Sequence, residues 1–116
     1  MKADELMLGN YFLDLNNEID EVYDIYFDTD EGVRFINNWN ISVIKPVLLT
    51  ERWLIKFGFK KIDKDINGYY VWMIEHITVF EQNKGYDYND STNIKYVHQL
   101  QNLYFALTGK ELKSIL

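Results

Sequence analysis

The stretch DKDING, which begins at Asp63, places oxygen-bearing side chains at alternate positions before a glycine. Asp63, Asp65 and Asn67 match the first ligand positions of an EF-hand calcium loop, in which carboxylate and amide oxygens coordinate Ca²⁺ and the glycine permits a sharp turn. The match ends there, because the bidentate carboxylate should stand at position 74, which is Ile74, and Glu75 comes one residue late. In an extended segment, an offset of one residue turns a side chain to the opposite face.

The residues that flank this stretch favour a turn over a metal site. FKKI before it and YYVWMI after it are typical of strands, whereas an EF-hand needs a helix on each side. Asn67 and Gly68 between two such runs predict a two-residue hairpin, since a type I′ turn requires positive φ at both central residues. We therefore predict a hairpin with Asp63 and Asp65 as solvated carboxylates. The alternative interpretation is a weak calcium site made by Asp63, Asp65 and Asn67.

His76 and His98 are the two imidazoles of the chain, and each falls on a different expected element. Glu75 would point to the opposite face of a strand from His76, so the two are not a ready acid–base pair. A zinc site or a catalytic triad needs a constellation of side chains and not a lone histidine. The chain has no cysteine, and the GxSxG, HExxH, P-loop and GxGxxG motifs are missing. We predict no catalytic residues and no cofactor.

The composition is that of one folded domain. A chain of 116 residues is long enough to bury a single core, and its 47% hydrophobic content is too high for a disordered segment. The first residues, MKADELMLGN, hold no apolar run of signal-peptide length, and the longest apolar run, 69–74, is too short to span a bilayer. The absence of cysteine suits a reducing compartment. These features predict a cytoplasmic protein without a membrane partner.

Charge is distributed unevenly. Residues 1–35 hold ten acidic residues against Lys2 and Arg34, a balance of −8, which leaves +2 for the rest of the chain. In the run 19–28 we predict one strand with acidic side chains outward and apolar side chains inward. The acidic face would be Asp20, Asp24 and Asp28, and the inward residues Ile19, Tyr23, Ile25 and Phe27. Such a face repels phosphate and can bind a basic partner, although we favour the simpler interpretation of a solvated face that prevents edge aggregation.

The order of elements predicts an α+β fold. Short strands at 11–15, 19–28, 33–36 and 39–44 form a small bent antiparallel sheet, and the opening residues resemble an SH3-like partial barrel. A short helix follows, with Thr50 as its N-cap and Gly58 at its C-terminal end. Two β-hairpins come next, with both faces of 69–74 covered, and then a C-terminal amphipathic helix that Asn93 caps and Gly109 ends. We predict a single domain, 1–116, with a β-rich acidic part (1–45) and a second part (47–116).

The last helix carries large side chains on two sides. Its apolar stripe consists of Tyr96, Leu100, Leu103, Tyr104 and Leu107. The opposite side consists of His98, Gln101, Asn102 and Phe105. Phe105 lies where water would be expected, so this side is covered either by the chain itself, which we favour, or by a partner. If it is open, His98, Gln101, Asn102 and Phe105 form an interaction patch.

Two segments carry a family resemblance. VLLTERWLIKFGFKK and IKYVHQLQNLYFALTGKEL resemble the two helices of a family of small uncharacterised proteins from gut anaerobic bacteria and their prophages. The resemblance extends only loosely to the first 45 residues. Val47-Leu48-Leu49 replaces the more usual Pro-Leu approach of the family, and Lys110 stands where Glu is common. The resemblance implies a single α+β domain in a mobile-element setting and implies no reaction or ligand.

These observations favour a non-catalytic protein-interaction or accessory protein of a prophage or mobile element. It would use the acidic N-terminal sheet or the outer side of the last helix. The alternative is a nucleic-acid-associated accessory protein, because Lys60, Lys61 and Lys64 lie among aromatic residues, where stacking and phosphate contact can combine. A calcium-binding protein or a metal-dependent enzyme has less support.

Overall fold

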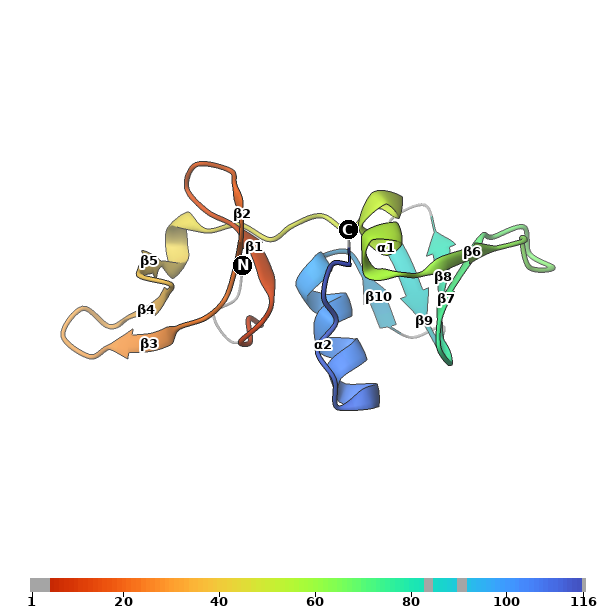
Figure 1. The fold of residues 1–116 in the computed structure, drawn as a ribbon. Coiled ribbons are helices and arrows are strands. Elements are labelled where there is room, and N and C mark those ends of the chain that lie inside the picture. The colour runs from red at the N-terminus through yellow and green to blue at the C-terminus, as the bar shows by residue number, and fades with distance from the viewer. Residues whose placement is uncertain (1–4, 83–84, 90–91, 116) are drawn as a thin grey trace.

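The computed structural model describes residues 5–82, 85–89 and 92–115, and it confirms an α+β fold (Figure 1). The helices are α1 (Glu51–Phe57), α2 (Val97–Thr108) and the 3-10 helix η1 (Ile41–Val43). The strands are β1 (Tyr11–Leu13), β2 (Ile19–Glu21), β3 (Ile25–Asp28), β4 (Val33–Ile36), β5 (Trp39–Asn40), β6 (Lys60–Ile62), β7 (Val71–Ile74), β8 (Ile77–Gln82), β9 (Gly85–Tyr88) and β10 (Thr92–Ile94). They pair antiparallel in three sheets, β1-β2, β3-β4-β5 and β10-β9-β8-β7-β6.

The molecule is elongated, with extents of 54 × 25 × 25 Å. The β3-β4-β5 sheet lies at one end, and the five-stranded sheet lies with α1 at the other (Figure 1). Each end has its own buried cluster. Ile44 belongs to the N-terminal cluster and Val47 to the C-terminal one, so the predicted boundary between the 1–45 and 47–116 parts falls between the two clusters.

The five-stranded sheet packs one face against both helices. Trp72 of β7 and Val79 of β8 are paired in register, and both are buried in one cluster with Leu54 of α1 and Leu100 of α2. The other face stays open, since Met73 is 38% exposed. The prediction that residues 69–74 are covered on both faces is therefore wrong, because α1 and α2 lie on the same side.

Local signals set the ends of the helices. Thr50 Oγ1 accepts a hydrogen bond from Trp53 N at 3.4 Å, and α1 ends at Gly58, which has φ 94°, as predicted. Gly109, with φ 74°, ends α2 as predicted. Asn93 does not cap α2, because it pairs with β9 as part of β10. Neither helix in the described residues has the length and apolar content that crossing a bilayer requires.

The run 19–28 is two strands and not one. Val22 in the break between β2 and β3 is 2% exposed, whereas Ile19, Tyr23 and Phe27, predicted to face inward, are 47%, 67% and 56% exposed. The break forms around Asn37, a buried residue with φ 51°. Its side chain donates to Glu21 O at 2.7 Å and accepts from Tyr23 N at 2.8 Å, so backbone groups that would otherwise need a partner strand are satisfied there. Ile25 faces the core, as predicted.

The DKDING stretch joins β6 to β7 and confirms the predicted hairpin, although its turn type is different. Positive φ occurs at Gly68 (83°) but not at Asn67. Gly68 N donates to Asp65 O at 3.0 Å, and Asp65 N donates to Tyr69 O at 2.9 Å. This pattern is a type I turn followed by a left-handed glycine, which makes a hairpin loop one residue longer than the predicted type I′ turn.

Candidate functional site

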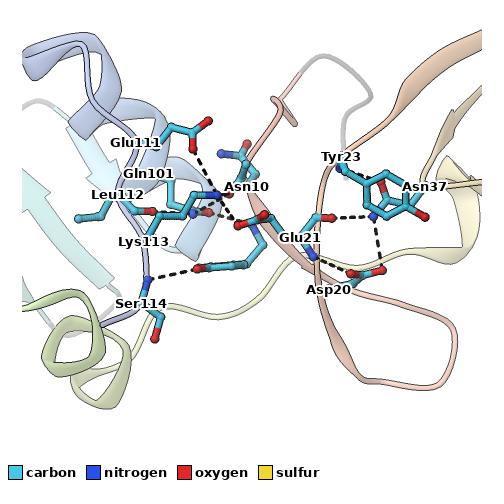
Figure 2. A network of polar contacts seen from close by, with 12 residues as sticks. Asn10, Asp20, Glu21, Tyr23, Asn37, Gln101, Glu111, Leu112, Lys113 and Ser114 are labelled. Atoms are coloured by element: carbon cyan, nitrogen blue, oxygen red, sulfur yellow. Dashed lines mark hydrogen bonds and ion pairs between the residues drawn. The ribbon is translucent and has the colours of Figure 1, made fainter. Parts of the chain in front are cut away.

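The outer side of α2 is covered by the chain itself, at the residues around β1. Gln101 is 4% exposed, and its Nε2 donates to Gly9 O at 3.1 Å and to Leu112 O at 3.0 Å. Its Oε1 accepts from Tyr11 N at 2.8 Å. The Gln101 side chain thus joins α2 to β1 and to the C-terminal segment, and its polar atoms are not available to a partner (Figure 2).

Asn102 has the same structural role one residue further along α2. Its Nδ2 donates to Glu5 O at 2.7 Å, and its Oδ1 accepts from Asn10 Nδ2 at 2.9 Å. Lys113 adds to this junction, because its Nζ donates to Gly9 O at 3.2 Å and forms a close ion pair with Glu21. The segment before β1 is therefore held against α2 by side chains of the helix, of the segment itself and of the C-terminal residues.

His98 is fully buried beside this segment. Its Nε2 lies 3.8 Å from Glu5 Oε2, and its ring stacks on Tyr96 with centroids 5.9 Å apart. Neither ring nitrogen makes a hydrogen bond within the described residues. Burial lowers the pKa of His98, and the negative charge of Glu5 opposes that shift. The histidine is a neutral core residue at pH 7.

Phe105 differs from the other three residues of the predicted patch, since it is 44% exposed. It lines a pocket of about 370 Å³ with Met7, Leu8 and Leu112. The amide side chains of the pocket wall, on Asn10, Gln101 and Asn102, already bond to the chain, and the Glu111 carboxylate pairs with Lys113. Of the four predicted patch residues, Phe105 alone presents a large uncovered surface.

The predicted acidic residues lie on separate elements. Asp20 Oδ1 accepts from Glu21 N at 2.8 Å, and its Oδ2 lies 3.4 Å from Asn37 Nδ2 (Figure 2). Asp24 is exposed in the break after β2. Asp28 Oδ1 accepts from Asp30 N at 2.9 Å and from Glu31 N at 3.1 Å, which shapes the turn between β3 and β4. All three carboxylates still belong to an acidic region, because six of the twelve residues from Asp20 to Glu31 are acidic and none is basic.

Exposed aromatic rings lie within that acidic region. Tyr26 of β3 and Phe35 of β4 are paired in register and stack with centroids 5.1 Å apart, and Tyr26 is 41% exposed. Phe27, the next residue, points to the opposite face of β3 and is 56% exposed. We call this set of residues the aromatic–acidic hairpin, which comprises Tyr26, Phe27, Asp28, Asp30, Glu31 and Phe35. Arg34, the register partner of Phe27, is the basic residue of the same hairpin.

The aromatic part of this site was not predicted from the sequence, because the alternation of residues 19–28 places Phe27 in the core. A usable signal was present, however. Tyr26 and Phe27 are adjacent in a strand, so one of the two rings must lie on the outer face. Apolar side chains ringed by charge are the usual composition of a protein-binding surface.

Of the three candidate metal residues, Asp65 is used within the β6–β7 turn, and Asp63 and Asn67 are exposed. Asp65 Oδ1 accepts from Asn67 N at 2.9 Å and from Tyr69 N at 3.0 Å. No group of three or more His, Cys, Asp or Glu side chains that could hold a metal ion occurs in the described part of the chain. His76 is exposed at the β7–β8 turn, and the adjacent Glu75 accepts from the Tyr104 hydroxyl at 2.9 Å. These arrangements offer no ready metal or acid–base chemistry.

The basic residues of the same hairpin lie over aromatic rings. Lys61 Nζ is 3.9 Å from the centroid of Tyr70, and Lys64 Nζ is 4.9 Å from it. Lys61 also pairs with Glu51 at 3.4 Å. The lysines therefore occupy ring surface on which a nucleotide base would stack.

Comparison of the chain with protein-family models, with curated proteins and with solved structures finds no match. The resemblance to a prophage-associated family and the resemblance to an SH3-like barrel accordingly stay predictions.

Proposed function

We propose that this protein is a non-catalytic interaction protein that binds a basic surface of a partner protein through the aromatic–acidic hairpin. The observation that carries the proposal is the exposure of Phe27, 56%, and of Tyr26, 41%, inside a run with six acidic and no basic residues. Aromatic side chains supply most of the binding energy at many interfaces. The surrounding carboxylates would steer a basic partner and set its orientation.

A purely solvating role for the acidic residues explains fewer features of the hairpin than an interaction role does. Carboxylates on a sheet prevent edge-to-edge aggregation, but exposed aromatic rings on the same hairpin act against solubility. The sheet is also stabilised without Phe27, since its packed side chains are Ile25, Ile36 and Trp39. An interaction role accounts for both the charge and the exposed rings.

The proposed setting is the cytoplasm of a bacterium that carries a prophage or mobile element. This part rests on the resemblance of the segments around α1 and α2 to the family described above and on the absence of cysteine. An accessory protein of this kind needs a binding surface and no catalytic site.

The test is affinity capture from a bacterial lysate with wild-type protein and two matched variants. Phe27→Ser removes the exposed ring of the hairpin, and Phe105→Ser removes a ring of similar exposure from the other candidate surface. We expect partners that bind the wild type and Phe105→Ser at low salt, and that are lost with Phe27→Ser and at high salt. Equal capture by Phe27→Ser contradicts the proposal.

The alternative, a nucleic-acid accessory protein, is favoured by three lysines of the β6–β7 hairpin, Lys60, Lys61 and Lys64, because the same hairpin carries the ring of Tyr69, which is 39% exposed. Electrostatic binding to phosphates is strongest at low salt. Titration of single- and double-stranded oligonucleotides at low ionic strength separates the two functions, because the alternative requires saturable binding that Lys60→Glu weakens.

A further inference from the structure

Strand β3 lies at the edge of the β3-β4-β5 sheet and, within the described residues, pairs with β4 on one side only. Figure 1 shows it along the lower border of that end of the molecule. Asn37 N donates to Asp24 O at 2.9 Å, one register position before the first pair of the two strands. Because hydrogen-bonded and non-hydrogen-bonded pairs alternate in antiparallel strands, the backbone N–H and C=O of Tyr26 point to β4, and those of Ile25 and Phe27 point to the free side.

The exposed rings of β3 lie on both faces of the sheet. Tyr26 is 41% exposed and Phe27 is 56% exposed, and neighbouring residues of a strand point to opposite faces. A partner that docks flat on one face covers only one of the two rings. A partner segment that pairs with the free side of β3 as a further strand also alternates its side chains, so it reaches both rings at once.

Each face of β3 favours a different kind of partner side chain. Asp28 lies on the same face as Tyr26, two residues away, and the exposed Asp24 precedes β3. A cationic side chain fits this face, because it is attracted both by the carboxylates and by the face of the tyrosine ring. Phe27 lies on the other face with its register partner Arg34, so an apolar side chain fits there and a cation does not.

The same charges disfavour a second copy of this chain as the added strand. A second β3 would bring its own Asp24 and Asp28 to an edge that already carries these residues. Like charges on neighbouring strands are destabilising, and charged residues at an edge are a common protection against self-pairing. A basic strand meets no such repulsion.

We propose that the free side of β3 binds an extended segment of the partner protein as an added strand, in which lysine or arginine alternates with apolar residues. The cationic side chains lie with Tyr26 and Asp28, and the apolar side chains lie against Phe27. Backbone hydrogen bonds to Ile25 and Phe27 supply affinity, and the alternating side chains supply specificity. This inference rests on the proposed function and adds to it the binding mode and the chemistry of the bound segment.

The test is an NMR titration of the ¹⁵N-labelled protein at low salt with three blocked hexapeptides. In the first, Lys and Val alternate; the second has the same composition with all Lys before all Val; in the third, Glu and Val alternate. We expect saturable binding of the first peptide, about fivefold weaker binding or less of the second, which cannot place its charges on one face, and no binding of the third.

Hydrogen exchange at saturating concentration of the first peptide reports the binding mode. The amides of Ile25 and Phe27 should exchange at least about tenfold more slowly, because the added strand accepts their hydrogen bonds. The amide of Tyr26 should change little, since it already points to β4. Tyr26→Ser and Phe27→Ser should each weaken binding about fivefold or more. Phe105→Ser, which removes a ring of similar exposure elsewhere, is the matched control and should leave the affinity unchanged.

Peptide-induced shifts without slower exchange at Ile25 and Phe27 overturn the inference, because they place the peptide on one face of the sheet. Equal affinity for the first two peptides, or no saturable binding, also overturns it. So does protection of the two amides in the free protein that increases with protein concentration, since a second copy would then occupy the edge. Failure of the proposed function is read separately, from equal lysate capture by wild type and Phe27→Ser.

Discussion

The side-chain oxygen Oε1 of Gln101 accepts a hydrogen bond from the backbone N–H of Tyr11 at 2.8 Å, across 90 residues of sequence. The same side chain donates to Gly9 O and Leu112 O. One glutamine on α2 therefore connects the N-terminal strand β1, the helix and the C-terminal segment. This use of Gln101 inside the fold is the reason that the aromatic–acidic hairpin, and not α2, is the favoured interaction surface.

Replacing Gln101 should lower the stability of the protein. Gln101→Ala leaves Tyr11 N and Leu112 O without their partner, whereas Gly9 O keeps its hydrogen bond from Lys113 Nζ. We expect the free energy of unfolding to fall by about 2–4 kcal/mol. Urea unfolding measures the change. Gln82→Ala is the control, because Gln82 is a half-exposed strand residue, and its effect should stay within about 0.5 kcal/mol. Equal stability of Gln101→Ala and wild type would show that this junction contributes nothing.

His98 should make stability depend on pH. Burial lowers the pKa of His98 in the folded protein, against the opposing charge of Glu5, so the folded state binds fewer protons than the unfolded state. Its contribution is complete above the unfolded value of about 6.5. Stability then falls as the pH decreases through that value, by at most about 1.4 kcal/mol per pH unit, until the folded-state pKa is reached.

Urea unfolding between pH 7.5 and 5 measures this slope. His98→Leu should reduce it by removing the buried titrating group. His76→Ala, which removes the other, exposed imidazole, is the matched control variant for this measurement. An unchanged slope in His98→Leu would assign the pH dependence to other groups.

Gly68 should be sensitive to substitution for reasons of backbone conformation alone. Its φ is 83°, and nothing lies within 4 Å of the position that a Cβ would occupy. Gly68→Ala should therefore cost about 1–2 kcal/mol through the left-handed conformation and not through a clash. Ile66→Ala, at a fully exposed position of the same turn, should change stability by less than about 0.5 kcal/mol. Thermal unfolding distinguishes the two, and similar values for both variants would refute the turn assignment.

Calcium should not stabilise the same turn. Asp65 Oδ1 already accepts two backbone N–H groups, and a bound ion would have to compete with them. A ligand that binds only the folded state stabilises it by RT ln(1 + [L]/Kd), so Tm rises with the logarithm of the ligand concentration above Kd. We expect no change in Tm on addition of Ca²⁺, and a concentration-dependent rise that Asp63→Asn abolishes would restore the metal interpretation.

Features encoded by neighbouring residues could be predicted from the sequence. Thr50 and Gly58 set the ends of α1 because capping depends on residues within one turn of the helix. The β6–β7 hairpin was predictable from Asn67 and Gly68, although the turn type depended on Asp65, whose carboxylate bonds forward to two backbone N–H groups.

Features that depend on distant residues could not be predicted in the same way. The break between β2 and β3 depends on Asn37, which bonds to Glu21, Tyr23 and Asp24 from a position beyond the β3–β4 hairpin. The alternation of residues 19–28 alone predicts a continuous strand. The outer side of α2 is likewise covered through amide side chains that bond to residues far away in the sequence. Helical periodicity predicts only that this side of the helix combines polar side chains with a large aromatic one.

Hydrogen–deuterium exchange of the protein, alone and bound to a partner captured as described above, tests the proposed interaction surface most directly. Backbone amides in residues 25–36 should exchange more slowly on binding, because the partner covers the aromatic–acidic hairpin. Exchange in α2 should stay the same, since its outer side is already covered by the chain. Protection confined to α2 and the pocket around Phe105, with residues 25–36 unchanged, would show that the aromatic–acidic hairpin is not the interaction surface.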